Sequence, residues 1–175
     1  TNNSLKHRNI DLTINQIVNS GNDSNDLTYF TSNHQSLATT SIEIYKDHLI
    51  FGSGPKQFRI LCDKYAITDA YKFCSTHPHN TYLQLMSETG LVGFIPVFLL
   101  FLFIFFYLIK YSYLLFFIKD KRNYYIFFST LGLLLALFPF SPSGNFFNNW
   151  LSIINYLQLI FFIYLIKKID IETIK

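Results

Sequence analysis

Residues 124–166 read YYIFFSTLGLLLALFPFSPSGNFFNNWLSIINYLQLIFFIYLI and contain no Asp, Glu, Lys, Arg or His. A second uncharged run covers residues 89–109. About 20 apolar residues in an α-helix cross the hydrocarbon of a bilayer, because each residue adds roughly 1.5 Å of length. We therefore predict an all-α polytopic membrane protein. Its three transmembrane helices would lie in residues 91–175, at 91–109 (or up to 118, with Lys110 snorkelling), 124–140 and 150–166.

The composition supports a membrane protein. Charged residues make up 14% of the chain, against roughly 25% in ordinary soluble domains, while half of the residues are hydrophobic. High hydrophobicity excludes disorder, and two cysteines are too few for a small disulfide scaffold. The alternative is that the uncharged runs are buried helices of a soluble protein. We favour it less, because such apolar runs are hard to bury in a chain of this length.

The positive charges predict the topology. Cationic residues follow the first apolar run at 110–122, and Lys167 and Lys168 follow the last one. Loops rich in Lys and Arg stay in the cytoplasm, so residues 110–123 and the short C-terminal tail are predicted there. Residues 1–90 would then lie outside the cytoplasm. Residues 1–80 hold seven Lys/Arg and seven Asp/Glu, a balance that argues against a nucleic-acid surface.

The polar half is predicted to be largely helical. We expect a short helix near 9–18, an amphipathic helix at 35–47 and a third helix at 56–65. Pro55 suits the first position of that third helix, with Gly54 as its cap. The Gly-rich turn before it lacks the ending of a nucleotide-binding P-loop. Thr81 and Gln84 have capping-box spacing, which predicts a fourth helix from Thr81 to a stop at Gly90.

The two cysteines are expected to pair. Outside the cytoplasm a disulfide between Cys62 and Cys74 is the default state. Because Arg59 lies one turn before Cys62 and His77 lies three residues after Cys74, the bridge would hold a cationic helix against the histidine segment. One rival is a zinc site made of these cysteines with His77 and His79, although its spacing is cramped. A Cys74 nucleophile is weaker, since a bridged sulfur cannot attack.

His79 and Asn80 are the main candidate site residues. They precede the predicted helix, whose free N–H groups favour an anion and a neutral imidazole. The simpler interpretation is that His79 only caps this helix. Likewise, Arg59 could merely pair with Asp63 on a solvated face. Glu88 is interpreted as a helix-end carboxylate without a catalytic role.

A family resemblance joins these motifs. His79-Asn80, followed after nine residues by Gly90-Leu91-Val92-Gly93, resembles the hallmark of the O-antigen ligase/polymerase superfamily. The flanking sequences HPHNTYLQ at 77–84, ETG at 88–90 and GSGPKQFR at 52–59 also look like this family. The resemblance extends over about residues 35–168.

The resemblance implies a fold and an activity. It implies a GT-C-like helical bundle in the bacterial inner membrane, with residues 1–90 as a periplasmic loop that carries the active-site motifs. The implied reaction moves a glycan from undecaprenyl diphosphate to an acceptor, without a metal or another cofactor. Ligases use the lipid A core or a similar acceptor, whereas polymerases use another carrier-linked repeat.

The resemblance also implies residue roles. His79 would be catalytic, Arg59 and Lys56 would bind the diphosphate, and His77, Asn80, Gly90 and Gly93 would support the motif. Many members have an Arg at the start of the helix that begins here near residue 35, and His34 or Arg8 could replace it.

Members have many more membrane helices than three, so we interpret the chain as a C-terminal fragment that is inactive alone. A less favoured alternative is a non-enzymatic membrane transport or anchoring protein. The apolar runs carry none of the ionisable residues that line transport pathways.

Overall fold

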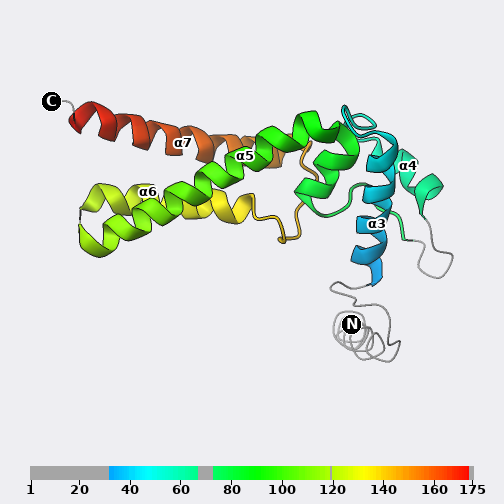
Figure 1. Ribbon diagram of the computed structural model, residues 1–175, viewed down its shortest axis with the longest axis horizontal. Coiled ribbons are helices and arrows are strands. Elements are labelled where there is room, and N and C mark those ends of the chain that lie inside the picture. Colours follow the sequence, from blue (N-terminus) through cyan, green and yellow to red (C-terminus); the bar gives the residue numbers. More distant parts are fainter. Residues whose placement is uncertain (1–31, 67–72, 119, 174–175) are drawn as a thin grey trace, which may run out of the picture.

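The computed structural model describes residues 32–66, 73–118 and 120–173, and these residues form helices without strands. Residues Thr81–Phe117 form the longest helix, α5, whose second half runs beside two later helices in an elongated part (Figure 1). The remaining described helices gather at one end of α5. The predicted helix at 9–18 and Arg8 lie outside the described residues. The other helices are α3 (Ser32–Asp47), α4 (Phe58–Tyr65), α6 (Lys121–Ala136) and α7 (Asn149–Thr173).

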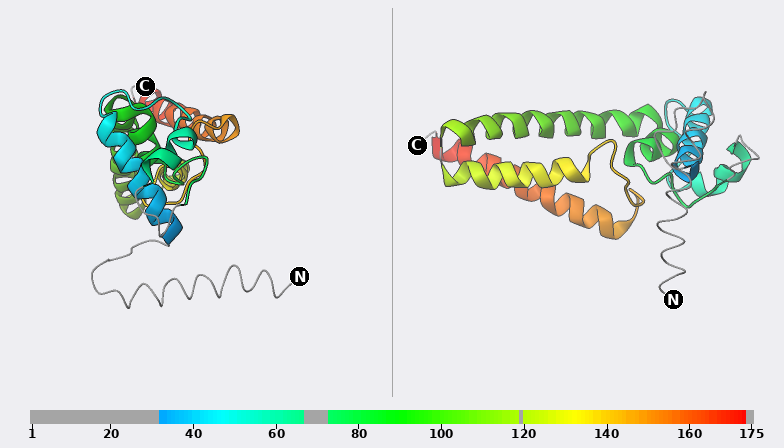
Figure 2. Two further views of the ribbon diagram at one scale, coloured as in Figure 1. Left: turned by 90° about the vertical axis from the view of Figure 1, so that its right-hand side faces the viewer. Right: turned by 90° about the horizontal axis from the view of Figure 1, so that it is seen from below.

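A backbone break divides α5 at Gly90. This residue has φ 61° and ψ −157°, a conformation open mainly to glycine. The break separates a short N-terminal part of α5, residues 81–89, from a long C-terminal part, residues 91–117. These two parts are called the first and second half of α5, and the first half lies beside α3 and α4 (Figures 1 and 2). The sequence predicted that the helix stops at Gly90. The structure shows an interruption there, after which the helix resumes at Leu91 and ends at Phe117, close to the longer of the two predicted limits.

The turn between α3 and α4 fills this break. The amide of Leu91 donates to the carbonyl of Leu49 at 2.9 Å, and the amide of Val92 donates to Ile50 at 3.2 Å. Both amides start the second half of α5, where no preceding helical turn supplies acceptors. The turn therefore takes the place of the missing helical turn.

Hydrogen bonds also run from the turn to the end of the first half of α5. The amide of Ser53 donates to the Ser87 carbonyl, and the amide of Gly54 donates to the Glu88 carbonyl, both at 2.9 Å. The carbonyls just before the break are thus satisfied as well. Both ends of the break are bonded to one continuous turn, residues 49–54.

Two glycines allow the backbones to approach this closely. A Cβ on Gly52 would lie 2.3 Å from the carbonyl carbon of Glu88, and one on Gly90 would lie 2.4 Å from the Ile50 oxygen. Both contacts are with backbone, which cannot move aside as a flexible side chain can. Both positions also have positive φ.

Helix α4 begins at Phe58, with Gln57 at its N-cap position. The predicted start at Lys56, with Pro55 first and Gly54 as cap, is wrong. Lys56 has φ 62°, which is incompatible with a right-handed helix. The turn that docks on α5 occupies these residues, so the helix starts two positions later.

Helix α3 packs against α4 through a small apolar core. Leu37 and Ile44 from α3 meet Phe58 and Cys62 from α4, and all four side chains are buried. The amphipathic helix predicted at 35–47 is confirmed, with a start three residues earlier. This core fixes α4, the helix that carries Arg59.

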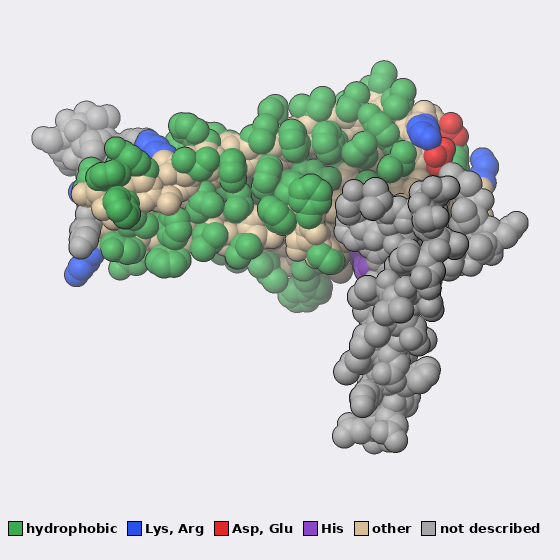
Figure 3. All heavy atoms as spheres, turned by 60° about the horizontal axis from the view of Figure 1, so that its bottom comes forward, with side chains coloured by type: hydrophobic (Ala, Val, Ile, Leu, Met, Phe, Trp, Pro, Cys, Tyr) green, Lys and Arg blue, Asp and Glu red, His purple; other side chains and the backbone are tan. Residues whose placement is uncertain are grey.

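The second half of α5 packs with α6, and α6 packs with α7. Buried Ile104, Tyr111, Ile126, Leu133 and Phe162 form the centre of this part. Its outer surface is covered by hydrophobic side chains (Figure 3). By length and composition, α5 and Asn149–Lys168 within α7 can cross a membrane, whereas α6 has only 16 residues. The arrangement with three spans stays a prediction.

The glycine contacts give a stability prediction. Gly52→Ala should lower the free energy of unfolding by at least about 1–3 kcal/mol, because the new Cβ meets backbone and φ stays positive. Gly132→Ala in α6 is the matched control, since nothing lies within 4 Å of its added Cβ. Thermal unfolding of the two purified variants in detergent provides the comparison. Equal melting temperatures would contradict the docking of the turn.

Candidate functional site

The histidine segment, residues 75–80, enters the site immediately before α5. His79 has φ 56°, a left-handed conformation that is uncommon for a residue with a side chain. The side chain of Asn80 caps α5 by accepting hydrogen bonds from the amides of Tyr82 at 3.0 Å and Leu83 at 3.1 Å. The predicted start of the helix at Thr81 is confirmed, but Thr81 is not its cap.

The loop between α6 and α7 holds this segment in place. The amide of Ser143 donates to the His79 carbonyl at 2.9 Å, and Asn80 Nδ2 donates to the Pro139 carbonyl at 2.6 Å. The Thr81 hydroxyl also donates to the Ser143 hydroxyl at 2.9 Å. These bonds offset the cost of the left-handed backbone at His79.

The sequence gives little indication of what the loop between α6 and α7 contacts. Its one available signal was composition, a charge-free run of Ser, Asn, Gly and Pro between two apolar segments. Such a run predicts a turn, but it does not indicate what the loop contacts. Its role in the site comes from pairs at least 55 residues apart in sequence.

Three imidazoles gather at the segment. The ring centroids of His77 and His79 are 4.2 Å apart, and the edge of His34 from α3 approaches His79 with centroids 5.8 Å apart. Ser75 Oγ lies 3.3 Å from His79 Nε2, and Thr76 Oγ1 lies 3.0 Å from His77 Nδ1. The structure thus places His34 in the site, next to the residue proposed as the base.

The surroundings favour neutral imidazoles. Burial lowers the pKa of His79 below the ordinary 6.5, and the nearby His34 lowers it further. Burial also lowers the pKa of His77, with added contributions from His79 and Arg59. The Ser143 backbone partly opposes this lowering. A neutral imidazole can accept a proton, which a cationic one cannot.

Arg59 lies close enough for its charge to act on His77. It is exposed on α4, and no ion pair joins it to Asp63, so the simpler pairing is not formed between these two described residues. Lys56 is exposed in the turn just before α4. The guanidinium of Arg59 is therefore available to an anion near the histidine segment.

A disulfide joins Cys62 of α4 to Cys74, one residue before the histidine segment, with Cα atoms 5.7 Å apart. Both sulfurs are used in this bond, which removes the thiolates that the rival zinc site requires. Among the described residues, no group of three or more His, Cys, Asp or Glu is arranged to hold a metal ion.

Two buried polar residues of α5, Glu88 and Gln84, bond to α4 and to the α6–α7 loop. Glu88, fully buried, accepts the amide of Phe58 at 2.9 Å through Oε1, so its carboxylate caps the start of α4. Gln84 donates to Glu88 Oε2 at 2.9 Å and to Asn145 Oδ1 at 3.0 Å, and it accepts the Phe146 amide. Glu88, predicted as a carboxylate at a helix end, thus links α4 to α5.

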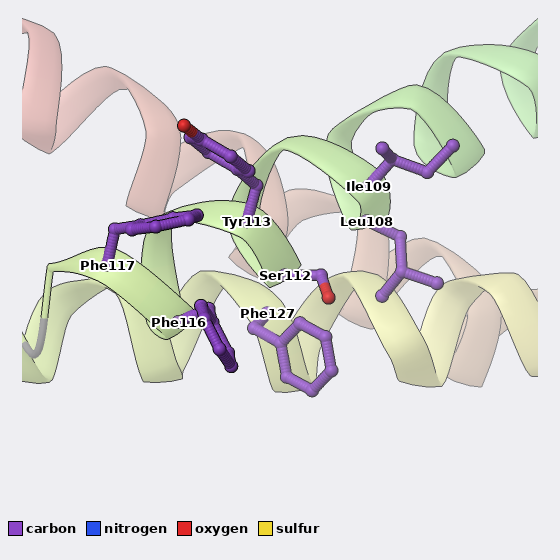
Figure 4. A pocket seen from close by; sticks show the side chains of 7 residues that line it. All are labelled: Leu108, Ile109, Ser112, Tyr113, Phe116, Phe117 and Phe127. Atoms are coloured by element: carbon purple, nitrogen blue, oxygen red, sulfur yellow. The ribbon is translucent and has the colours of Figure 1, made fainter.

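Two hollows lie away from the charged groups. A cavity of about 120 Å³ between α5, α6 and α7 is lined mainly by apolar side chains, including Leu137 and Phe146, whose backbones bond to α5. A larger, open hollow of about 670 Å³ lies at the far end of α5 (Figure 4). Phe127 of α6 and six residues of α5 line it, with no His, Arg or carboxylate among them.

The buried carboxylate gives a prediction. Glu88→Ala should lower the free energy of unfolding by about 1–3 kcal/mol, because the Phe58 amide and the Gln84 amide lose a buried acceptor. Glu43→Ala is the matched control, since that carboxylate forms only an exposed pair with Lys46, worth about 0–1 kcal/mol. Denaturant titration in detergent measures both. A Glu88 variant as stable as the control would remove this link from the account.

Residues 31–98 match the family model described as O-antigen ligase. No curated protein and no solved structure matches the chain. The matched residues cover less than half of the chain, from α3 through the histidine segment to the start of the second half of α5. This match confirms the resemblance predicted from the His-Asn and Gly motifs, and it is consistent with a member of the O-antigen ligase/polymerase superfamily.

Proposed function

We propose that this chain, related to the O-antigen ligases through residues 31–98, belongs to a membrane glycosyltransferase. Its donor would be a glycan linked to undecaprenyl diphosphate, and its acceptor a hydroxyl of the lipid A core or of a similar molecule. The observation that carries this proposal is one arrangement. Arg59, an exposed cation whose charge acts on His77, and His79, whose pKa is lowered by burial, lie at the start of a long apolar helix.

Cations would bind the donor. The leaving group is a diphosphate on which negative charge develops, so cations placed near it lower the barrier. Arg59 can bind two phosphate oxygens at once, and Lys56 would add a second charge. Arg8 is proposed as a further contact. No cofactor is required, since the diphosphate is already an activated leaving group.

His79 would act as the general base. Its neutral imidazole would accept the proton of the acceptor hydroxyl while the oxygen attacks the anomeric carbon of the donor sugar. The bond from that carbon to the phosphate oxygen breaks, and the carrier diphosphate leaves with its electron pair. A single displacement of this kind inverts the anomeric configuration. His77, Asn80, Gly90 and Gly93 would hold the segment in its working shape.

The donor's lipid tail would lie beside the apolar helices. We propose that α5 and α7 cross the bacterial inner membrane and that residues 1–90 face the periplasm, as the positive charges at 110–122 favour. The histidine segment would then lie at the periplasmic surface of the inner membrane. The apolar cavity that includes Leu137 and Phe146 would hold the first isoprene units of the carrier.

A polymerase of the same superfamily is the second candidate function. It would handle the same donor at Arg59 and His79, and would differ only in using a carrier-linked repeat as acceptor. A non-enzymatic membrane protein is less favoured. In such a protein the lowered pKa values of His77 and His79 would serve no proton transfer.

The roles of the two main residues can be tested by substitution. In the full-length protein, His79→Ala should reduce glycan transfer by about 10²–10⁴-fold, the typical contribution of a positioned base. Arg59→Ala should also reduce transfer, through loss of phosphate binding. His48→Ala and Lys64→Ala are the matched controls, and both should retain wild-type transfer. The assay follows a labelled carrier-linked glycan into its acceptor in isolated membranes, and normal transfer by the His79 variant would contradict the proposal.

The pH dependence has a predicted direction. The base works only while His79 is neutral, so transfer should fall as the pH drops through its folded-state pKa. Burial and His34 lower that pKa, which places the loss of transfer below pH 6.5. A pH–rate profile under limiting donor measures this limb. A loss of transfer that begins well above pH 6.5 would contradict a neutral, buried His79.

A further inference from the structure

Helix α3 brings a third imidazole into the site. His34 is half-buried near the start of α3, and its edge approaches His79 with an interplanar angle of 79°. The core formed by Leu37, Ile44 and their partners on α4 fixes the helix that presents it. The position of His34 is therefore set by α3 packing and not by the histidine segment itself.

Among the described residues, no carboxylate forms an ion pair with any of the three imidazoles. On α3, Glu43 pairs with Lys46, and Asp47 accepts the hydroxyl of Tyr65. On α5, the buried Glu88 accepts the amide of Phe58. On α4, Asp63 is exposed and forms no ion pair among the described residues.

The groups whose charges act on His77 and His79 are all basic. They are His79 and Arg59, which act on His77, and His34 from α3, which acts on His79. A proton placed on any one of these imidazoles raises the cost of placing a proton on its neighbour.

We propose that His34 is a positioning residue for His79, packing against its ring and opposing its protonation so that His79 stays in the proton-accepting form. The inference rests on the proposed function only for its use in catalysis. The physical coupling between the two rings is separate from any reaction. His34 thus joins the site from α3, although it lies 45 residues before His79 in sequence, a placement that motif spacing does not reveal.

The coupling gives opposite effects for two substitutions. His34→Gln removes the titrating ring and should raise the pH at which His79 is half-protonated. His34→Arg introduces a permanent cation and should lower that pH. A merely structural role would disturb both variants in the same way. His48→Gln is the matched control, because His48 lies beyond the other end of α3, about 21 Å away at 1.5 Å per residue.

The measurement does not need enzyme activity. Diethyl pyrocarbonate acylates a neutral imidazole but not a protonated one. The rate of modification of His79, followed by peptide mass spectrometry from about pH 5 to 8, therefore reports its protonation. The full-length protein in detergent is used. Near-wild-type melting temperatures establish that each variant is folded, and His34→Asn replaces the Gln variant if that one is unstable.

The outcomes separate the two proposals. Opposite shifts for the Gln and Arg variants, with no shift for His48→Gln, support the coupling even if no glycan transfer is found. Such a result without transfer would count against the proposed function alone. Unchanged His79 profiles in both variants would overturn the inference about His34, whether or not the protein transfers glycan. Shifts in one common direction would also overturn it.

Discussion

The break in α5 at Gly90, filled by the turn at 49–54, is the constraint on which the rest of the structure depends. A helix cannot change direction without leaving amides and carbonyls unpaired, and buried unpaired groups are costly. Here the turn supplies acceptors to the amides of Leu91 and Val92, and it donates to the carbonyls before the break. The same exchange of hydrogen bonds joins the turn that leads into α4 to the helix that follows the histidines. Glycine at 52 and 90 is required because any Cβ would meet backbone.

The chemistry of the site follows from this docking. Once the turn is held on α5, the amide of Phe58 reaches the buried Glu88, and α4 starts with Arg59 near enough for its charge to act on His77. The disulfide joins α4 to that segment from the other side. The α6–α7 loop then holds His79 in a left-handed conformation. Separate elements thus fix the cation and the imidazole, and neither depends on a flexible loop end.

The sequence predicted the parts that depend on local patterns. The amphipathic period placed α3, the spacing of Thr81 and Gln84 marked the start of α5, and Gly90 was predicted as a stop where the structure has a break. The spacing of polar residues did not identify the N-cap residues of α4 and α5. Gln57 and Asn80 take these positions because the turn docks on α5 and the α6–α7 loop bonds to Asn80. For the same reason Pro55 does not begin a helix, although its type suits that position.

The site residues were predictable in identity but not in surroundings. His79, His77 and Arg59 stood out through their motif, whereas the contact with His34 and the bonds to Ser143 join residues 45 and 64 positions from His79. Such contacts are set by packing between elements, and a single sequence contains no signal for them.

The central claim is that α4 and the histidine segment form one site. The most direct test is to map the cysteines of the full-length protein, isolated from membranes under non-reducing conditions with free thiols blocked. The account predicts one cross-linked peptide pair that joins Cys62 to Cys74, since their Cα atoms lie 5.7 Å apart. Two separately alkylated cysteines in the folded protein would contradict it, because α4 and the histidine segment would then lack the bond that holds them together.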